Sequence, residues 1–347
     1  MKNDFGFITL MSMRGNVRIV LVVIVLIIIL ILLISSLSIP ERFQFWTSNL
    51  RPIGDFKGKV LYVESIKESI EFPPYGDIML GDIHSKSSRR INFDQYYDAS
   101  PSYSPINNVI YFESKRKEGS QSQLLSAPSD LYKYDIESNK ILHARTDIAF
   151  ALKYDDSEIV SPLVSMVNDS LFAFFERRYS DQRLVVCNFI KKVVLVDIPV
   201  EVHKATIIDS FMKSYVVVFD SERSNRMKVG TYFVNLETQG VAYVPDEFAS
   251  EYYFTGLPRH DSDYYYGVGK GHSQKAKIYS YNVEAQNISF VNDLAIGTNS
   301  SVEVVVNDSL VVLYRSDDRE SIVLRTNQSE NEIISTGHEI TGFRFYF

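Results

Sequence analysis

The sequence predicts an all-β fold built from repeated units of four short strands. The first observation is composition: the chain of 347 residues contains 22 Tyr and 22 Phe but a single Trp, and aromatic residues favour strands. The second is a duplicated segment, Val-Asn-Asp-Ser-Leu, at Val167–Leu171 and Val306–Leu310. The third is the spacing of similar strands, at roughly 46 residues per unit. Short strands at this spacing are typical of the blades of a β-propeller.

One of the repeated strands ends in charged residues. Val109–Arg116 (Val-Ile-Tyr-Phe-Glu-Ser-Lys-Arg) matches Val216–Arg223 (Val-Val-Val-Phe-Asp-Ser-Glu-Arg). Shorter copies of the same pattern occur at Leu61–Ser65, Ala173–Arg177 and Val312–Ser316. We interpret these segments as the same strand of successive blades.

A second repeated strand ends in a turn. Tyr132–Asn139 matches Tyr232–Gly240 and Tyr279–Asn287, and Leu80–Lys86 is a looser copy. Each copy has Asp or Asn at one offset and Ser, Asn or Gly soon after, which are residues that cap turns and accept a positive φ. These segments are therefore predicted to be strands followed by hairpin turns.

The order of the repeats predicts six blades and a closed ring. Innermost strands are expected near Ser100–Ser104, Ile159–Val167, Thr206–Ser210, Glu251–Thr255, Ser301–Val306 and Ile340–Phe347. The last of these has no blade after it, and the first blade, which begins at Lys59, has no inner strand before it. Pairing the C-terminal strand with the first blade would remove the exposed sheet edges. The predicted fold is a six-bladed β-propeller closed by its C-terminal strand.

Asp98–Asp135 contains the residues that resemble a known repeat. Its matches are Pro101, Tyr103, Ser104, Pro105, Ser114 and Arg116, with Asn107-Asn108 in place of an Asp-Gly turn. This unit resembles the WD40-like repeat of TolB-like propellers, and the other units keep only the strand pattern. The resemblance implies a TolB-like six-bladed propeller, a fold whose members mostly serve as protein-binding modules of the cell envelope or as domains beside a hydrolase.

An apolar segment precedes the repeats. Every residue of Ile19–Ile34 is apolar, and the run extends to Ile39, which is the length of about 20 residues that a transmembrane helix needs. The predicted organisation is a cytoplasmic tail at 1–18, a transmembrane signal anchor at 19–39, a linker at 40–57 and the propeller at 58–347. Because long folded domains are translocated largely regardless of charge, we expect a single pass through the cytoplasmic (inner) membrane, with the N-terminus inside and the propeller extracytoplasmic. The alternative is a secretory signal cleaved near Ser36-Leu-Ser38.

Composition and motifs exclude several classes of function. The formal charge of −7 argues against a nucleic-acid partner, which requires a dense basic surface. Cys187 is the single cysteine, and its apolar neighbours predict a buried structural residue. No zinc-ligand spacing, nucleophile elbow or phosphate loop is found, so no catalytic residue, metal ligand or cofactor is assigned.

The loops between second and third strands carry basic residues in five blades, and two histidines lie just before inner strands. The candidate binding residues are Arg116, Arg178, Arg223, Lys270, Arg319, His203 and His338. Together they predict a surface that binds an acidic protein or glycan. In the competing interpretation these segments bind nothing. Acidic residues such as Glu113 and Glu176 lie among the basic ones, and loops of mixed charge usually form a solvated surface with weak ion pairs.

The predicted function is therefore that of a membrane-anchored, non-catalytic protein- or glycan-binding module of the cell envelope. One alternative is a polysaccharide lyase or hydrolase of the propeller type, with histidines and acids at the mouth of the channel. Another is the sensory ectodomain of a membrane complex. The fold alone does not distinguish them, because one scaffold supports many functions.

Overall fold

A computed structural model describes most of the repeat region. The described residues are 56, 58–66, 75–92, 96–116, 129–166, 170–179, 181–199, 202–207, 215–221, 230–235, 241–243, 252–254, 264–269, 275–282, 285, 287–295, 300–306, 309–315, 320–325 and 329–346. The chain forms two compact units, Met1–Arg51 and Pro52–Phe347. The predicted tail and transmembrane segment, 1–39, lie outside the described residues, and within those residues no helix is long and apolar enough to cross a membrane.

The described part of the chain is mostly β-strand and forms six four-stranded antiparallel sheets. In chain order the strands are β1 (Lys59–Ile66), β2 (Tyr75–Asp82), β3 (Ser87–Arg90), β4 (Asp98–Ser104), β5 (Val109–Ser114), β6 (Asp130–Asp135), β7 (Lys140–His143), β8 (Glu158–Met166), β9 (Leu171–Arg178), β10 (Asp181–Asn188), β11 (Val193–Pro199), β12 (Val202–Ile207), β13 (Tyr215–Ser221), β14 (Gly230–Asn235), β15 (Val241–Tyr243), β16 (Tyr252–Phe254), β17 (Tyr264–Gly269), β18 (Lys275–Asn282), β19 (Asn287–Ala295), β20 (Ser300–Val306), β21 (Ser309–Arg315), β22 (Glu320–Arg325), β23 (Glu330–Thr336) and β24 (Glu339–Tyr346). Short helices α3 (Arg145–Ile148) and η1 (Ala149–Ala151) follow β7.

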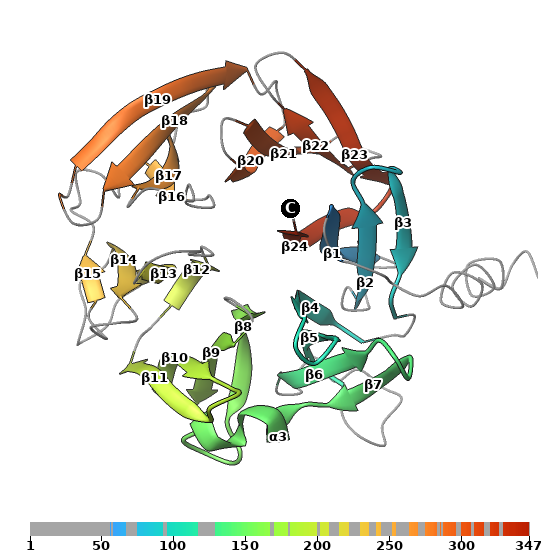
Figure 1. Cartoon of the computed structure of the whole chain (residues 1–347), viewed down its shortest axis with the longest axis vertical. Coiled ribbons are helices and arrows are strands. Elements are labelled where there is room, and N and C mark those ends of the chain that lie inside the picture. The colour runs from blue at the N-terminus through green and yellow to red at the C-terminus, as the bar shows by residue number, and fades with distance from the viewer. Residues whose placement is uncertain are drawn as a thin grey trace, which may run out of the picture. The chain divides into compact units, whose positions relative to one another are not determined.

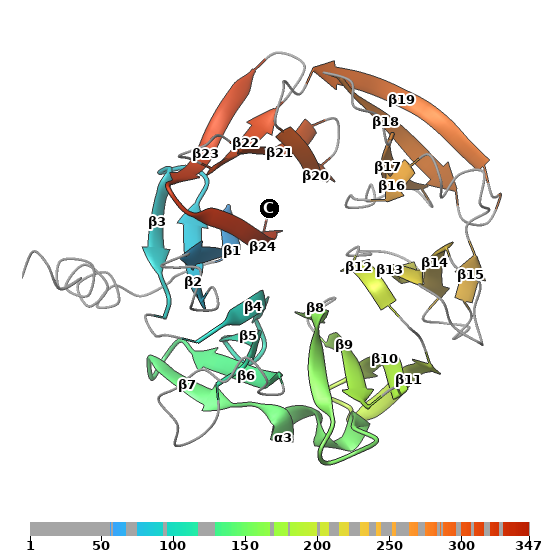
Figure 2. The same cartoon turned by 180° about the vertical axis from the view of Figure 1, so that it is seen from behind.

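Five sheets consist of four consecutive strands, and the sixth has the order β24-β1-β2-β3. Lys59 of β1 pairs with Tyr346 of β24, and Ser65 pairs with Glu339. Both views show β24 beside β1, and the other sheets following one another in chain order (Figures 1 and 2). The predicted inner strands correspond to β4, β8, β12, β16, β20 and β24. β12 begins at Val202, earlier than the expected Thr206, because its pairing with β13 extends to Val202 opposite Ser221.

In β1 and β5, each the second strand of its sheet, adjacent residues pack into different hydrophobic cores, because side chains alternate along a strand. Leu61 packs with residues of β2, β5 and β6, whereas Tyr62 packs with residues of β22 to β24. Phe112 shares the core of Leu61, and its neighbour Tyr111 packs with Phe172 in the next core. The first two sheets therefore bury both faces against their neighbours, and each fully buried large side chain contributes about 1.5–3 kcal/mol.

Hairpin turns with the predicted chemistry join third and fourth strands. The Asp82 carboxylate accepts hydrogen bonds from the backbone N–H groups of His84 (3.0 Å) and Ser85 (2.8 Å), and Asp135 does the same for Glu137 (3.0 Å) and Ser138 (2.9 Å). These bonds explain why the repeated turn motif carries Asp or Asn at this position. The turns end on residues with positive φ: Lys86 (54°), Asn139 (52°) and, in the third sheet, Lys192 (53°).

A bulge in the inner strand recurs where serine precedes proline. The pairing of β4 with β5 shifts between Ala99 and Ser102, around Ser100-Pro101, and Ser100 has a φ of 52°. The pairing of β8 with β9 shifts around Ser161-Pro162. Proline has no N–H to donate to the sheet, so a bulge is where an inner strand can hold it.

The antiparallel order defines two ends of the propeller. We call the hairpin end the one that carries the β2–β3, β4–β5, β6–β7 and β10–β11 turns. We call the crossover end the opposite one, where the chain passes from one sheet to the next and where β5–β6 and β9–β10 are joined. Arg116 follows β5 and Arg178 is the last residue of β9, and both strands run towards the crossover end.

Candidate functional site at the crossover end

In the first three sheets the second strand (β1, β5 or β9) carries a buried glutamate close to the crossover end. Glu64, Glu113 and Glu176 each pair with the second residue of an inner strand, namely Ile340, Ala99 and Ile159. Glu113 is 2% exposed and Glu176 is 1% exposed. The interpretation of these acids as part of a solvated surface is therefore wrong for both residues. The repeated strand pattern placed both glutamates in strands, but the cover of Glu176 comes from Lys153, Tyr154 and Ser157, which lie far from it in the chain.

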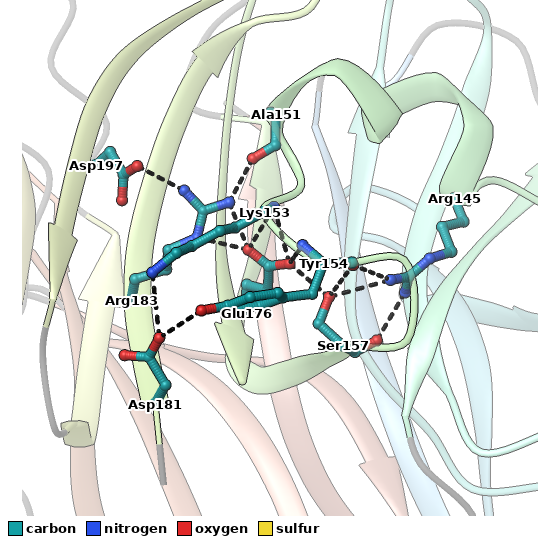
Figure 3. A network of polar contacts seen from close by, with 9 residues as sticks. All are labelled: Arg145, Ala151, Lys153, Tyr154, Ser157, Glu176, Asp181, Arg183 and Asp197. Carbon is teal, nitrogen blue, oxygen red and sulfur yellow. Dashed lines mark hydrogen bonds and ion pairs between the residues drawn. The ribbon is translucent and has the colours of Figure 1, made fainter. Parts of the chain in front are cut away.

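Glu176 is the centre of a polar network that fixes the crossover between the second and third sheets (Figure 3). Its carboxylate accepts hydrogen bonds from the backbone N–H groups of Lys153 and Tyr154 (3.1 Å each) and from the Ser157 hydroxyl. Arg183, on the neighbouring strand β10, donates to it from Nε and forms a buried ion pair. The carboxylate thus satisfies backbone donors that the crossover could not satisfy by itself.

The environment of Glu176 keeps it ionised. Burial raises the pKa of its carboxyl, but the hydrogen bonds from Ser157, Lys153 and Tyr154 and from Arg183 outweigh burial, so that the pKa lies below its ordinary value. A carboxylate in this state acts as a fixed acceptor.

Two arginines hold the same crossover from its two sides. Arg183 donates from Nη2 to the carbonyl of Ala151 (2.6 Å) and from Nη1 to Asp197 (2.7 Å). Arg145 donates to the carbonyls of Tyr154 (3.0 Å) and Ser157 (2.8 Å). Figure 3 shows Glu176 between Arg183 on one side and Ser157 and Arg145 on the other. The crossover is held by charged hydrogen bonds along its length, which are the strong class.

The fixed crossover presents an aromatic and cationic cluster at the surface. The Arg178 guanidinium lies 4.6 Å from the ring centroid of Tyr154 and 5.5 Å from that of Tyr179, distances typical of cation–π contacts. Arg178 also donates to Asp156 (2.9 Å), and the Tyr154 hydroxyl donates to Asp181 (3.1 Å). We call Tyr154, Arg178 and Tyr179 the Tyr–Arg–Tyr cluster.

Tyr179 is the unusual member of this cluster. It is 87% exposed, although it is a large aromatic residue. Its φ is 55°, in the left-handed region that bulky side chains rarely adopt. A strained and exposed aromatic residue beside a held arginine is an observation from which a functional role can be inferred.

The other predicted binding residues have different surroundings. Arg116 forms an ion pair with buried Asp98 (2.6 Å) and lies over the rings of Tyr96, Phe112 and Tyr132, at 5.1–5.3 Å from their centroids. Its guanidinium is thus engaged within its own blade.

His338 is exposed, and its backbone N–H donates to Thr336 (3.2 Å). Arg223, Lys270 and Arg319 lie outside the described residues, as does the side chain of His203. Their role in binding stays a prediction.

The prediction for Cys187 is confirmed. It is fully buried, its thiol contacts the carbonyl of Phe172 (3.6 Å), and burial raises its pKa to about 12. In the described part of the chain, no three His, Cys, Asp or Glu residues are grouped so as to hold a metal ion.

Sequence reasoning identified Arg178 but missed Tyr154 and Tyr179. The chain contains 22 tyrosines, and the aromatic residues of an all-β protein are expected in its core, so neither tyrosine stood out. The available signal was position: Tyr179 directly follows β9, in the short turn between Arg178 and Asp181, which pair with each other.

Comparisons with known proteins bear on the fold. The chain matches no model of a protein family, and no curated protein shows significant similarity to it. Its structure is similar to the crystal structure of TolB from Acinetobacter baumannii, with a TM-score of 0.53 and 11% identity, over 84% of this chain and 67% of TolB. It is also similar to an oligogalacturonate lyase in complex with manganese, with a TM-score of 0.48 and 12% identity, over 79% of this chain and 73% of the lyase. At such identities a likeness establishes the fold alone. The chain therefore has the fold of the TolB-like β-propellers.

Proposed function

We propose that the protein is a non-catalytic protein- or glycan-binding module of the cell envelope. In this proposal the six sheets are the blades of a propeller closed by β24, and residues 19–39 anchor it in the cytoplasmic membrane with the propeller outside. Support for closure comes from the pairing of β24 with β1. Support for the anchor comes from the apolar run Ile19–Ile39.

The observation that carries the binding role is the Tyr–Arg–Tyr cluster. Tyrosine and arginine are enriched among the residues that dominate binding energy at protein interfaces. Tyrosine also offers a large contact area at a low cost in side-chain entropy. Tyr179 is already exposed and Arg178 is already held, so a partner would order little of the cluster on binding.

The charges around the cluster bear on the kind of partner. Arg178 is paired with Asp156 (2.9 Å), and Lys153 is paired with Asp181 (3.3 Å). An acidic partner would have to compete with these carboxylates of the chain itself. The Tyr179 side chain is 87% exposed, so we expect the partner to contact Tyr179 first and the arginine through displacement of Asp156.

The test is affinity capture of the full chain from detergent-solubilised envelope, with identification of both proteins and glycans. We expect a partner that is retained by the wild type and lost in a Tyr179→Ala/Arg178→Ala double variant. Leu142→Ala is the matched control, because Leu142 is an exposed apolar residue on the outer strand β7. A partner retained equally by both variants would contradict the proposed site, and depolymerisation of an added acidic glycan would favour the lyase alternative.

A further inference from the structure

The Tyr179 ring is exposed among charged neighbours. Its turn is closed by the pairing of Arg178 with Asp181. Within the described residues of the β7–β8 crossover and the β9–β10 turn, Tyr179 is the one large apolar side chain that is exposed. The core of a protein–protein interface is depleted of charged residues. A single ring bordered by charges therefore lacks the apolar surroundings that a protein partner would bury.

The charges of the Tyr–Arg–Tyr cluster are paired within the chain itself. Arg178 is paired with Asp156 (2.9 Å), and Lys153 is paired with Asp181 (3.3 Å). Both cations also lie against the ring of Tyr154, at 4.6 Å and 5.0 Å from its centroid. An anionic ligand would have to compete with the two carboxylates, and a cationic ligand would have to compete with the two cations. The pairs therefore disfavour a ligand of either net charge.

A ligand that both donates and accepts hydrogen bonds can use these pairs. The side chains of Arg178 and Asp156 are 36% and 60% exposed, and exposed ion pairs are weak, so a ligand can enter between them at low cost. A hydroxyl group is both a donor and an acceptor. Of two adjacent hydroxyl groups, one can accept from the guanidinium while the other donates to the displaced carboxylate. Neither charge is then left without a partner.

We propose that the Tyr–Arg–Tyr cluster binds a neutral glycan. The apolar C–H face of a sugar ring stacks on the exposed Tyr179, and adjacent sugar hydroxyls bond to the Arg178–Asp156 pair. Tyr154 joins this pair to the next one, because its ring lies against Arg178 and its hydroxyl donates to Asp181 (3.1 Å). This inference rests on the proposed function and narrows it: the partner is a glycan, and it is neutral where the sequence predicted an acidic one.

Selective destruction of the ligand tests its chemical class without knowledge of the sugar. Envelope is immobilised and treated either with periodate, which cleaves the bond between carbons that bear adjacent hydroxyl groups, or with protease. Binding of the purified full-length chain in detergent is then measured. We expect periodate to abolish binding and protease to leave it. Binding should be the same in low and high salt, because a neutral ligand offers no charge to screen.

Variants assign this binding to the cluster and to a neutral ligand. Tyr179→Ala should weaken binding by about 30-fold, as for a residue that dominates binding energy, and the surface control Leu142→Ala should leave it unchanged. Asp156→Asn removes the carboxylate that competes for Arg178. An anionic ligand should then bind more tightly than to the wild type, whereas a neutral glycan should not.

Each contrary outcome has a distinct meaning. Binding that survives periodate but not protease assigns the cluster to a protein partner; it overturns this inference and leaves the proposed function intact. Periodate-sensitive binding that rises in Asp156→Asn, or falls in high salt, indicates an acidic glycan and also overturns it. Periodate-sensitive binding that is equal in Tyr179→Ala and the wild type places the glycan elsewhere, with the same consequence. A chain that binds no untreated envelope contradicts the proposed function itself.

Discussion

At the scale of single residues, Tyr179 is held in a conformation that costs stability. A non-glycine residue in the left-handed region lowers the free energy of unfolding by about 1–2 kcal/mol. Burial of the Tyr179 side chain offsets little of this loss, because the side chain is exposed. A residue that lowers stability at an exposed position is expected where function requires it.

Tyr179→Gly should therefore raise the free energy of unfolding by about 1 kcal/mol and abolish partner binding, because glycine adopts a positive φ without strain but has no ring. Urea denaturation measures the first effect and affinity capture the second. Lys192→Gly, at a φ of 53° in a hairpin turn, is the control: it should stabilise by a similar amount and leave capture unchanged. A destabilised Tyr179→Gly variant would show that the tyrosine has a structural role instead.

Glu176 is the residue on which the buried network depends. Glu176→Gln removes the charge that Arg183 faces in a buried pair, and breaking such a pair costs about 3–5 kcal/mol. We expect the loss of stability in Glu176→Gln to lie at the lower end of that range, because Asp197 remains paired with Arg183.

The pH dependence of this contribution has a defined sign. Since the pKa of Glu176 is lowered on folding, its stabilisation is present above the pKa of an unfolded glutamate, about 4.3, and is lost as the pH falls through the lowered folded pKa. Denaturation midpoints measured from neutral pH down to about pH 3 should fall less steeply in Glu176→Gln than in the wild type. Parallel curves would contradict the assignment.

At the scale of elements, the hairpin turn is the unit that the sequence predicts best. Its aspartate, its serine and its left-handed residue are local, so the pattern at Tyr132–Asn139 identifies strand and turn together. The crossover is the opposite case: Glu176 bonds to Tyr154 and Arg116 to Asp98, residues that are far apart in the chain. Nothing in the local pattern shows that Arg116 faces inward.

Asp135→Ala tests the turn. It removes the acceptor of two backbone N–H groups, and losing a comparable cap costs about 1 kcal/mol. Thermal denaturation of this variant should show a lower midpoint, whereas Asp135→Asn, which keeps the acceptor oxygen, should lie close to the wild type. If both variants are equally destabilised, the charge of Asp135 matters more than its hydrogen bonds.

At the scale of the whole molecule, the C-terminal strand joins the two ends of the repeat region. Ile340 of β24 is fully buried in the core that includes Tyr62 of β1 and Ile322 of β22. The sequence predicted this pairing from the surplus inner strand at one terminus and the missing one at the other. The pairing of β24 with β1 agrees with this expectation.

Ile340→Ala should lower the free energy of unfolding by about 2–5 kcal/mol, as expected for a large-to-small change in a core. Ile322→Ala, in the same core, should cost a similar amount, and Leu142→Ala, on the surface, less than about 0.5 kcal/mol. Chemical denaturation of the three variants measures this. An Ile340→Ala variant as stable as Leu142→Ala would contradict closure by β24.

The proposed binding role depends on one surface, the Tyr–Arg–Tyr cluster at the crossover end. The most direct measurement is photo-crosslinking in living cells, with benzoyl-phenylalanine replacing Tyr179 in the full-length chain and, as the control, replacing Leu142. The proposed binding role predicts a discrete cross-linked product from position 179 and none from position 142. No product from position 179, or the same products from both positions, would contradict it.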